Sequence, residues 1–229
     1  MKPIGFICSP YLEKFAIPRQ PMLAPSAIGY CELINEAGNP DAVRELETFS
    51  HIWILFDFHQ TKIQGWQALV RPPRLGGNKK VGVFASRSTF RPNSIGMSLV
   101  ELIKVESLTI NKKPINRLHV KGLDLVHGTP ILDIKPYLPY SDSVPNALAG
   151  YAQNTPQTHL QIKFTKLLTS EIQPDLKQLI IEVLQQDPRP AYQYGQISNR
   201  EYGVLLAGYN IKFTYPEINT IKVLSMVKI

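Results

Sequence analysis

The residues with the most evident chemical potential lie in a turn-rich stretch, residues 85–98 (ASRSTFRPNSIGMS). Arg87 and Arg91 can each offer a planar fork of donors to a carboxylate or a phosphate. Pro92 stiffens the turn, because it fixes φ and removes a backbone donor. Two apolar, strand-like runs flank the stretch at 81–84 and 95–105. Loops held between rigid strands often carry function, so we expect an anion-binding loop here; the alternative is a basic hairpin tip in solvent.

A second constellation comes at the end of an alternating stretch, residues 51–59 (HIWILFDFH). One face of this expected strand is wholly apolar and should enter the core. That face consists of Ile52, Ile54, Phe56 and Phe58. The other face ends in Asp57 and His59, two titratable groups delivered to one place. They could serve a site or an interface, or they could form a structural Asp–His pair.

Two further loops combine stiffness with hydrogen-bond donors. In residues 14–21 (KFAIPRQP) two prolines hold the backbone extended, so Arg19 and Gln20 project from a fixed frame. An ordinary connector is the alternative for this segment. In residues 127–130 (HGTP) a glycine and a proline predict a turn between two strands that exposes backbone N–H groups.

The positive charge of the chain is concentrated in one part of it. The 229 residues include 25 Lys and Arg against 18 Asp and Glu, a net charge of +7. Residues 58–100 contain no Asp or Glu, and their basic residues are Lys62, Arg71, Arg74, Lys79, Lys80, Arg87 and Arg91. A concentrated field speaks to binding rather than to fold, and nucleic acid is the leading candidate partner. A solvated basic face is the alternative.

These loops need a scaffold, and the pattern around them is that of short β-strands. Apolar runs predict strands at 4–8, 27–34, 51–59, 67–70, 81–84, 95–105, 108–110 and 118–120, and on either side of the 127–130 turn. Asn39, Pro40 and Asp41 predict the start of a short helix that runs to about Glu47. Many short strands with one short helix indicate a barrel or a sandwich. A doubly wound nucleotide fold is not expected, because neither GxGxxG nor GxxxxGK[ST] is present.

The apolar residues of one long run, residues 95–105, alternate along the chain. Between 95 and 105 they share one face of the expected strand and are interrupted only by Glu101. They are Ile95, Met97, Leu99, Ile103 and Val105.

The last third of the chain has a different pattern. A proline-rich stretch at 138–156 predicts a linker, and Pro174 then opens an amphipathic helix. Its apolar stripe consists of Leu176, Leu179, Ile180, Val183 and Leu184. Strands expected at 160–164, 202–207, 211–215 and 221–227 supply the surface that the stripe needs. The sequence therefore predicts a mainly β protein, with a small closed β-barrel N-terminal domain at 1–140 and a smaller α+β C-terminal domain at 141–229.

Three separated motifs together resemble one family. Residues 15–20 (FAIPRQ), 87–98 (RSTFRPNSIGMS) and 128–137 (GTPILDIKPY) are similar to the TrmO family, and the tail motifs at 187–190 (DPRP) and 202–203 (YG) are similar to its C-terminal domain. Members of that family are S-adenosylmethionine-dependent tRNA methyltransferases, which methylate N6 of threonylcarbamoyladenosine at position 37. The resemblance implies a small β-barrel, a homodimer, and a cofactor bound near the subunit boundary.

The resemblance also implies where the cofactor binds. The implied contacts are Arg19, Gln20, Pro21, Phe58, His59, Arg87, Met97, His127, Gly128, Thr129 and Pro130. The family commonly has Asp where this chain has His127, so a carboxylate contact is not available there, whereas a backbone contact is. Arg19 or Arg87 can pair with the carboxylate of S-adenosylmethionine. The acceptor nitrogen must lose a proton, and the candidate bases are His59, Asp57 and Asp133, which the sequence does not rank.

The tRNA anticodon loop, with its unstacked bases and phosphates, accounts for the basic stretch. The candidate RNA contacts are Arg71, Arg74, Lys79, Lys80 and Arg91. If about five such groups neutralise phosphates, log affinity falls with log salt at a slope of about −3.5 to −4.5. We expect Arg91→Ala to weaken tRNA binding and Arg87→Ala to weaken cofactor binding.

Two other functions stay open at this point. A non-catalytic RNA-binding barrel would keep the basic face without the chemistry, although Gln20 on a rigid loop favours the enzyme. A small-molecule hydrolase using Asp57 and His59 lacks a nucleophile, because no GxSxG elbow is present. Cys8 and Cys31 lack CxxC spacing and are expected to be reduced. The histidines are not spaced as a zinc site, and no run reaches the length of a membrane span, so we expect a cytoplasmic protein without a metal.

Overall fold

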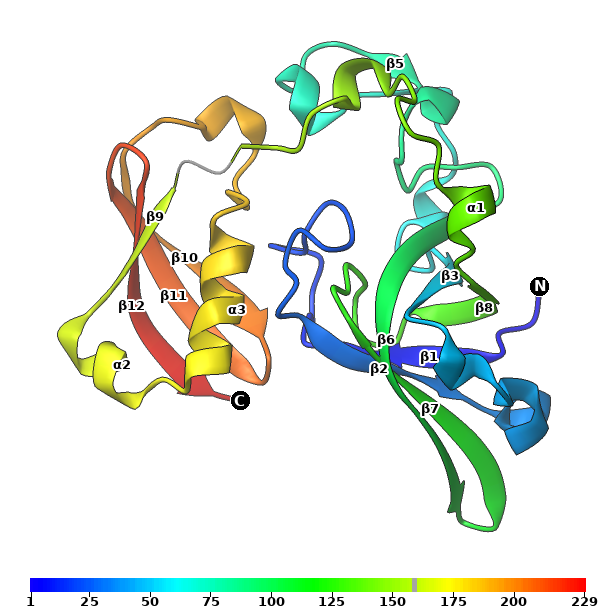
Figure 1. Ribbon diagram of the computed structural model, residues 1–229. Helices are drawn as coiled ribbons and strands as arrows, with labels where there is room; N and C mark the ends of the chain where they lie inside the picture. Colours follow the sequence, from blue (N-terminus) through cyan, green and yellow to red (C-terminus); the bar gives the residue numbers. More distant parts are fainter. Residues whose placement is uncertain (158–159) are drawn as a thin grey trace.

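The structure is a computed structural model that describes residues 1–157 and 160–229 (Figure 1). Its first body is a closed antiparallel barrel in the order β1-β2-β7-β6-β3-β8. The strands are β1 (Gly5–Cys8), β2 (Ile28–Leu33), β3 (His51–Asp57), β6 (Ile95–Ile110), β7 (Lys113–Lys121) and β8 (Pro130–Pro136). The predicted mainly β fold with a closed N-terminal barrel is confirmed, and closure leaves no unpaired strand edge.

Strand β3 places its side chains as its alternation predicts. Ile52, Ile54 and Phe56 are at most 4% exposed and form part of the barrel core, whereas Trp53 and Leu55 point outward and are half-buried. Phe58 follows the end of the strand and packs against the edge of this core while remaining half-buried.

Strand β6 turns the opposite face inward from the one its apolar residues suggest. Cross-strand partners share a face, and β3 pairs Ile54 with Ser98 and Leu55 with Met97. The inward residues are therefore Gly96, Ser98, Val100 and Leu102, all buried. Met97 is 53% exposed on the outer face. The strand continues unbroken to Ile110 across a register shift after Leu102, and its hairpin with β7 extends beyond the barrel (Figure 1).

The helix predicted after Asn39 is wrong as a single element. Residues 35–48 form three short 3₁₀ turns, at Asn35–Gly38, Pro40–Val43 and Leu46–Thr48. The capping signal itself is correct, because the Asn39 side chain accepts a hydrogen bond from the Asp41 N–H at 3.0 Å. Glu45 has a left-handed backbone with φ of 67°, which breaks the helical path before Leu46.

An arm of residues 58–94 separates β3 from β6. It contains the two-stranded sheet of β4 (Leu69–Val70) and β5 (Val81–Gly82) and the 3₁₀ turns Lys62–Gln64, Pro73–Leu75 and Val83–Ala85. The strand predicted at 81–84 therefore ends at Gly82. Figure 1 shows this arm above the barrel, reaching towards the second body. All seven basic residues of the 58–100 stretch lie on the arm.

The second body is the smaller α+β region that the sequence predicts. Its sheet has the order β10-β11-β12-β9, formed by β9 (Gln161–Phe164), β10 (Ser198–Leu206), β11 (Tyr209–Glu217) and β12 (Thr220–Lys228). Helix α2 (Lys166–Glu171) follows β9, and α3 (Pro174–Leu184) lies across one face of the sheet (Figure 1). The predicted stripe of α3 is confirmed, because Leu179, Ile180, Val183 and Leu184 are buried.

The two bodies touch at several points and are linked by one long connection. Glu182 of α3 accepts hydrogen bonds from the N–H and Oγ of Ser26, at 2.8 and 2.9 Å, and Tyr11 forms a β-bridge with Leu206. The connection contains α1 (Pro139–Asp142) and the 3₁₀ turn Gly150–Ala152. The predicted domain boundary between residues 140 and 141 falls within α1 and stays a prediction.

Candidate functional site

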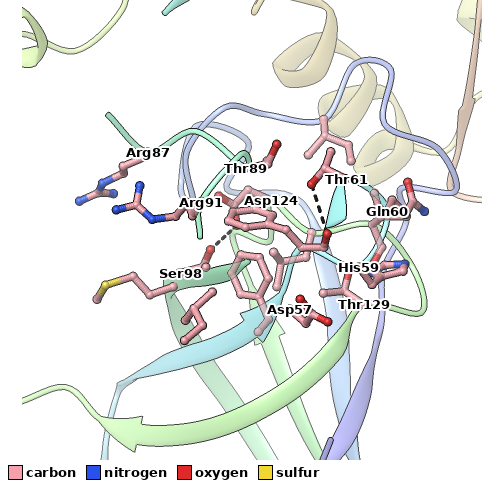
Figure 2. Close-up of a pocket in the computed structure, with 18 of the residues that line it drawn as sticks. Asp57, His59, Gln60, Thr61, Arg87, Thr89, Arg91, Ser98, Asp124 and Thr129 are labelled. Atoms are coloured by element: carbon pink, nitrogen blue, oxygen red, sulfur yellow. Dashed lines mark hydrogen bonds between the residues drawn. The ribbon is translucent and has the colours of Figure 1, made fainter. Parts of the chain in front are cut away.

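A cavity of about 720 Å³ lies at one end of the barrel, where four separate segments converge (Figure 2). They are the loop at 14–20, the end of β3 with the first part of the arm, the loop at 86–91 with the start of β6, and the segment 124–129 before β8. This volume lies within the range of small-molecule sites. The loops at 14–20 and 86–91 and the end of β3, which the sequence singled out for donors and titratable groups, thus meet at one place.

Arginine side chains line one side of the cavity. Arg87 Nη1 donates to Gln20 Oε1 at 2.5 Å, so the two predicted cofactor contacts hold each other across the cavity mouth. Arg19 also lines the cavity, and its Nη2 donates to the hydroxyl of Tyr194 in the second body at 2.7 Å. The loop at 14–20 is therefore fastened both to the arm and to the C-terminal region.

Arg91, a predicted phosphate contact, makes hydrogen bonds within its own loop. Its Nη1 donates to the carbonyl of Ser86 at 2.9 Å and of Val83 at 3.3 Å, and its guanidinium lies 5.6 Å from the ring centre of Phe84. Arg91 is half-buried and lines the cavity. Its hydrogen bonds therefore brace the loop that carries Arg87, and its role as an RNA contact stays a prediction.

An apolar wall faces the arginines. Phe58 lines the cavity beside Phe56, with their ring centres 5.0 Å apart and nearly perpendicular. Gly96 makes this packing possible, because a Cβ there would come within 2.3 Å of the Phe56 ring and 2.8 Å of the Phe58 ring. An apolar aromatic wall of this kind can pack against an aromatic ligand.

Asp57 and His59 both line the cavity, and Asp133 does not. The Asp57 carboxylate lies 3.4 Å from Lys62 Nζ. Asp133 pairs with Leu55, whose side chain points outward, and its carboxylate lies 3.1 Å from Lys135 Nζ on the outside of the barrel. Asp133 therefore lies outside the cavity lining, and its role as a candidate base stays a prediction.

A second carboxylate, that of Asp124, lines the cavity and was not among the sequence candidates. Its Oδ1 accepts a hydrogen bond from Ser98 Oγ at 2.6 Å (Figure 2). Burial raises the pKa of Asp124 to about 6, against the lowering effects of the Ser98 hydrogen bond and of Arg87. In the sequence, the one sign of this site residue was a single acid between two apolar residues, Leu123 and Leu125.

The 127–130 turn contributes less than expected. Thr129 is buried and lines the cavity, but His127, Gly128 and Pro130 do not line it, and neither does Pro21. The N–H of His127 donates to the Tyr11 carbonyl and that of Gly128 to the Ile7 carbonyl, both at 2.8 Å. The amides that the sequence offers to a ligand are therefore used within the barrel.

A larger groove of about 1500 Å³ adjoins the cavity, between the arm and the second body. Six residues line both spaces: Arg19, Gln20, Ser86, Arg87, Thr89 and Phe90. Arg71 and Arg74 line the groove as predicted RNA contacts. Lys79 and Lys80 are exposed on the arm but do not line the groove.

A buried ion pair supports the far wall of this groove. Arg189 is 2% exposed, donates through Nε and Nη2 to the two carboxylate oxygens of Asp187 at 2.9 and 2.8 Å, and stacks 3.5 Å from the ring centre of Tyr215. Its Nη1 donates to the carbonyl of Gln196 at 2.8 Å. These bonds close the 187–196 loop, which presents Tyr194 to Arg19.

The donor set of the cavity fits a zwitterionic nucleoside such as S-adenosylmethionine. Arg87 offers a guanidinium for a carboxylate, and Phe58 and Phe90 offer apolar faces for a purine. Among residues 1–157 and 160–229, no His, Cys, Asp and Glu side chains group in threes as a metal site would require. Over the same residues, no helix has the length and apolar character to cross a bilayer.

Fold and site together define a class: a closed β-barrel with a nucleoside-sized cavity at the ends of its strands, joined to an α+β domain across a basic groove. The sequence matches the family of the tRNA-methyltransferase O N-terminal domain over residues 6–143 and the TrmO C-terminal domain over residues 157–229. The chain belongs to the TrmO family.

Individual relatives agree with this assignment. The chain is 54% identical over 216 residues to a tRNA (adenine(37)-N6)-methyltransferase of Escherichia coli, covering 92% of this chain and 90% of that protein. It is 42% identical to a putative S-adenosylmethionine-dependent methyltransferase, RcsF, of Pseudomonas aeruginosa, over 99% of this chain and 96% of the relative. The crystal structure of TrmO from Pseudomonas aeruginosa superposes with a TM-score of 0.75 at 38% identity, over 98% of this chain and 97% of that one.

Proposed function

We propose that this chain transfers a methyl group from S-adenosylmethionine to N6 of threonylcarbamoyladenosine at position 37 of tRNA. The observation that carries the proposal is the junction of two spaces. A nucleoside-sized cavity with a guanidinium, apolar walls and buried acid opens through six shared residues into a groove lined by arginines. Membership of the TrmO family supplies the class of reaction.

The residues that would hold the methyl donor come from the four segments that form the cavity. Arg87 is the proposed partner of its carboxylate, with Arg19 and Gln20 beside it. Phe58, Met97 and Thr129 supply contact surface, and His59 completes that side of the cavity. The donor supplies an electrophilic methyl group on a sulfonium, so the contribution of the protein is mainly to fix the attack geometry.

The groove is the proposed path of the anticodon loop. Arg71 and Arg74 line it, and Tyr151 and Tyr194, also in its lining, are 37% and 39% exposed. Unstacked RNA bases stack readily on exposed aromatic rings. The groove leads towards Arg87 and Phe90, so a base extruded from the loop would enter the cavity from this side.

We also propose that the chain works as a homodimer in the cytoplasm. The outer face of β3 and β6 carries the apolar cross-strand pairs Trp53–Leu99 and Leu55–Met97, and Met97 also borders the cavity. A second copy seated there would bring the subunit boundary to the cofactor. The two cysteines are unpaired, which suits a reducing compartment. Sedimentation of Met97→Lys tests the dimer: a monomer is expected, and an unchanged dimer would refute this face.

The proposed function is tested with two tRNA substrates. The purified chain is incubated with isotopically methyl-labelled S-adenosylmethionine and either tRNA bearing threonylcarbamoyladenosine or the same tRNA with plain adenosine at position 37. Mass spectrometry of the nucleosides should find one labelled methyl on the threonylcarbamoyl nucleoside only. Binding of tRNA without any methyl transfer would instead support a non-catalytic RNA-binding barrel.

A further inference from the structure

We infer that Asp124 is the group that accepts the proton leaving the methylated nitrogen; this inference rests on the proposed function. Asp124 lies in the segment that follows β7, with its carboxylate in the cavity lining. In Figure 2 it lies between Arg87 and Arg91 on one side and Asp57 and His59 on the other. A ligand that fills the cavity would therefore come into contact with it.

The setting of Asp124 holds its carboxylate in one orientation. Ser98 is 1% exposed, and its Oγ donates to Asp124 Oδ1 at 2.6 Å. Ser98 is the one hydroxyl on the buried face of β6, between Gly96 and Val100. This bond fixes the carboxylate at Oδ1, on the edge of a cavity that a ligand can fill. An oriented, poorly hydrated carboxylate is a stronger base than one in water.

The charged and titratable groups around Asp124 leave it as a base of intermediate strength. Arg87 acts on it from the arm and lowers its pKa, but burial outweighs this effect. Tyr11 lies on the barrel side; burial first, and the charges of Asp124 and Glu182 second, raise the pKa of its phenol. Tyr11 therefore stays neutral, and its hydroxyl has no partner among the described residues. A base with a pKa near the working pH is the most effective one.

The other acids and bases of the cavity are less suited to this role. The Asp57 carboxylate faces the ammonium of the exposed Lys62 at 3.4 Å, which competes with a ligand for that carboxylate. His59 follows the end of β3, and no side-chain hydrogen bond orients its ring within the part of the chain that the structure describes. All three groups are half-buried, but only Asp124 among them accepts a short hydrogen bond from a buried hydroxyl, that of Ser98 at 2.6 Å, which fixes its direction.

The step balances without any further reactant. The N6–H bond breaks and its proton goes to the Asp124 carboxylate, while the electron pair of the nitrogen forms the new N–CH₃ bond. The bond between the methyl carbon and sulfur breaks, and its electron pair stays on sulfur. A carboxylate and a sulfonium thus become a carboxylic acid and a thioether, so charge is lost in a buried site rather than created there.

Asp124→Asn is the first test, because the amide keeps an acceptor for Ser98 and loses the base. The single-turnover rate of methyl transfer at saturating tRNA and S-adenosylmethionine should fall about 10²- to 10⁴-fold. The dissociation constant for S-adenosylmethionine, measured by calorimetry, should change by less than about threefold. Asp41→Asn is the matched control, because Asp41 is an exposed carboxylate far from the cavity, on a 3₁₀ turn.

Two results would overturn the inference. A wild-type rate in Asp124→Asn would show that another group takes the proton. A fall in rate matched by an equal loss of affinity for S-adenosylmethionine would make Asp124 a cofactor contact. Neither result touches the proposed function, which fails only if the wild-type chain does not methylate the modified tRNA.

Ser98→Ala keeps the inference testable even if Asp124→Asn does not fold. Loss of the Ser98 hydrogen bond removes a lowering effect on the Asp124 pKa, so that pKa should rise. In the ligand-free Ser98→Ala variant, the carboxyl ¹³C resonance of Asp124 should titrate at a higher pH than in the wild type. The acid limb of the pH–rate profile should move to higher pH by the same amount, while the plateau rate stays unchanged. A limb that does not move with the resonance would assign the proton transfer to another group.

Discussion

Asn in place of Asp124 should stabilise the ligand-free protein at high pH, even though it removes activity. Burial raises the pKa of Asp124 from an ordinary 3.8 to about 6. Between these values the folded chain holds a proton that the unfolded chain has released, so stability falls as the pH rises. Above both pKa values the loss of stability reaches its full size of about 3 kcal/mol, because each unit of difference between the folded and unfolded pKa is worth about 1.4 kcal/mol.

The neutral amide avoids this cost and still accepts the bond from Ser98 Oγ. Part of the gain is lost because the NH₂ group needs partners of its own, so we expect a net stabilisation of about 1–3 kcal/mol near pH 8. For a chain of this size that corresponds to a rise in Tm of about 2–12 °C. Near pH 4, where both forms are largely uncharged at this position, the gain should shrink to about 0.5 kcal/mol.

Thermal unfolding followed by circular dichroism at the two pH values measures this effect. Asp41→Asn, which removes an exposed carboxylate, should move Tm at neither pH by more than about 1 °C. If Asp124→Asn were less stable than the wild type near pH 8, or if its gain were the same at both pH values, the reasoning about a buried, costly charge would be refuted.

Three further predictions concern binding and stability. Arg189→Ala should lower the free energy of unfolding, measured by chemical denaturation, by about 3–5 kcal/mol, because it leaves the Asp187 carboxylate buried without its partner. Changing the exposed Arg200 to Ala should lower it by less than about 0.5 kcal/mol. Equal effects of the two changes would contradict this prediction. Arg87→Ala should weaken S-adenosylmethionine binding at least about tenfold in calorimetry. Arg71→Ala, in the outer groove, should leave that binding unchanged. A loss of affinity in both variants would show that S-adenosylmethionine and tRNA are not bound separately by the cavity and the groove. Of the five predicted RNA contacts, Arg91 bonds within its own loop and the other four are exposed, so log tRNA affinity should fall with log salt at a slope of about −3 to −3.5. A slope near zero would exclude phosphate contacts by the arm.

Regular elements with a clear periodicity were predictable from the sequence. The alternation in 51–57 gave the correct buried face of β3, and the spacing of Leu179, Ile180 and Val183 gave the correct buried face of α3. Both patterns place all their large apolar residues on one side. In such cases burial of apolar area decides the orientation, and local sequence is sufficient.

Strand β6 shows where this reasoning fails. Its larger side chains, Met97 and Leu99, lie outside, and Gly96 and Ser98 lie inside. The inside is set by Phe56 and Phe58, which fill the space above Gly96, and by Asp124, which needs the Ser98 hydroxyl. These partners come from distant parts of the chain, so a pattern within the strand cannot reveal the outcome.

The site was predicted in outline and missed in its details. Prolines and arginines identified the loops that converge, because stiffness and donors are local properties. The uses of individual side chains depend on long-range contacts: Arg91 bonds to backbone within its own loop, and Arg19 bonds to Tyr194, 175 residues away. Asp124 was not predicted as a site residue, because a single acid in an apolar run is equally typical of a strand position that faces solvent.

The most direct measurement is a crystal structure of the chain grown with S-adenosylmethionine. We predict electron density for the ligand in the barrel-end cavity, with its carboxylate at Arg87 and its methyl group directed towards the side of Asp124. Density for the ligand in the outer groove, or an empty cavity at a concentration that saturates binding in solution, would contradict the account.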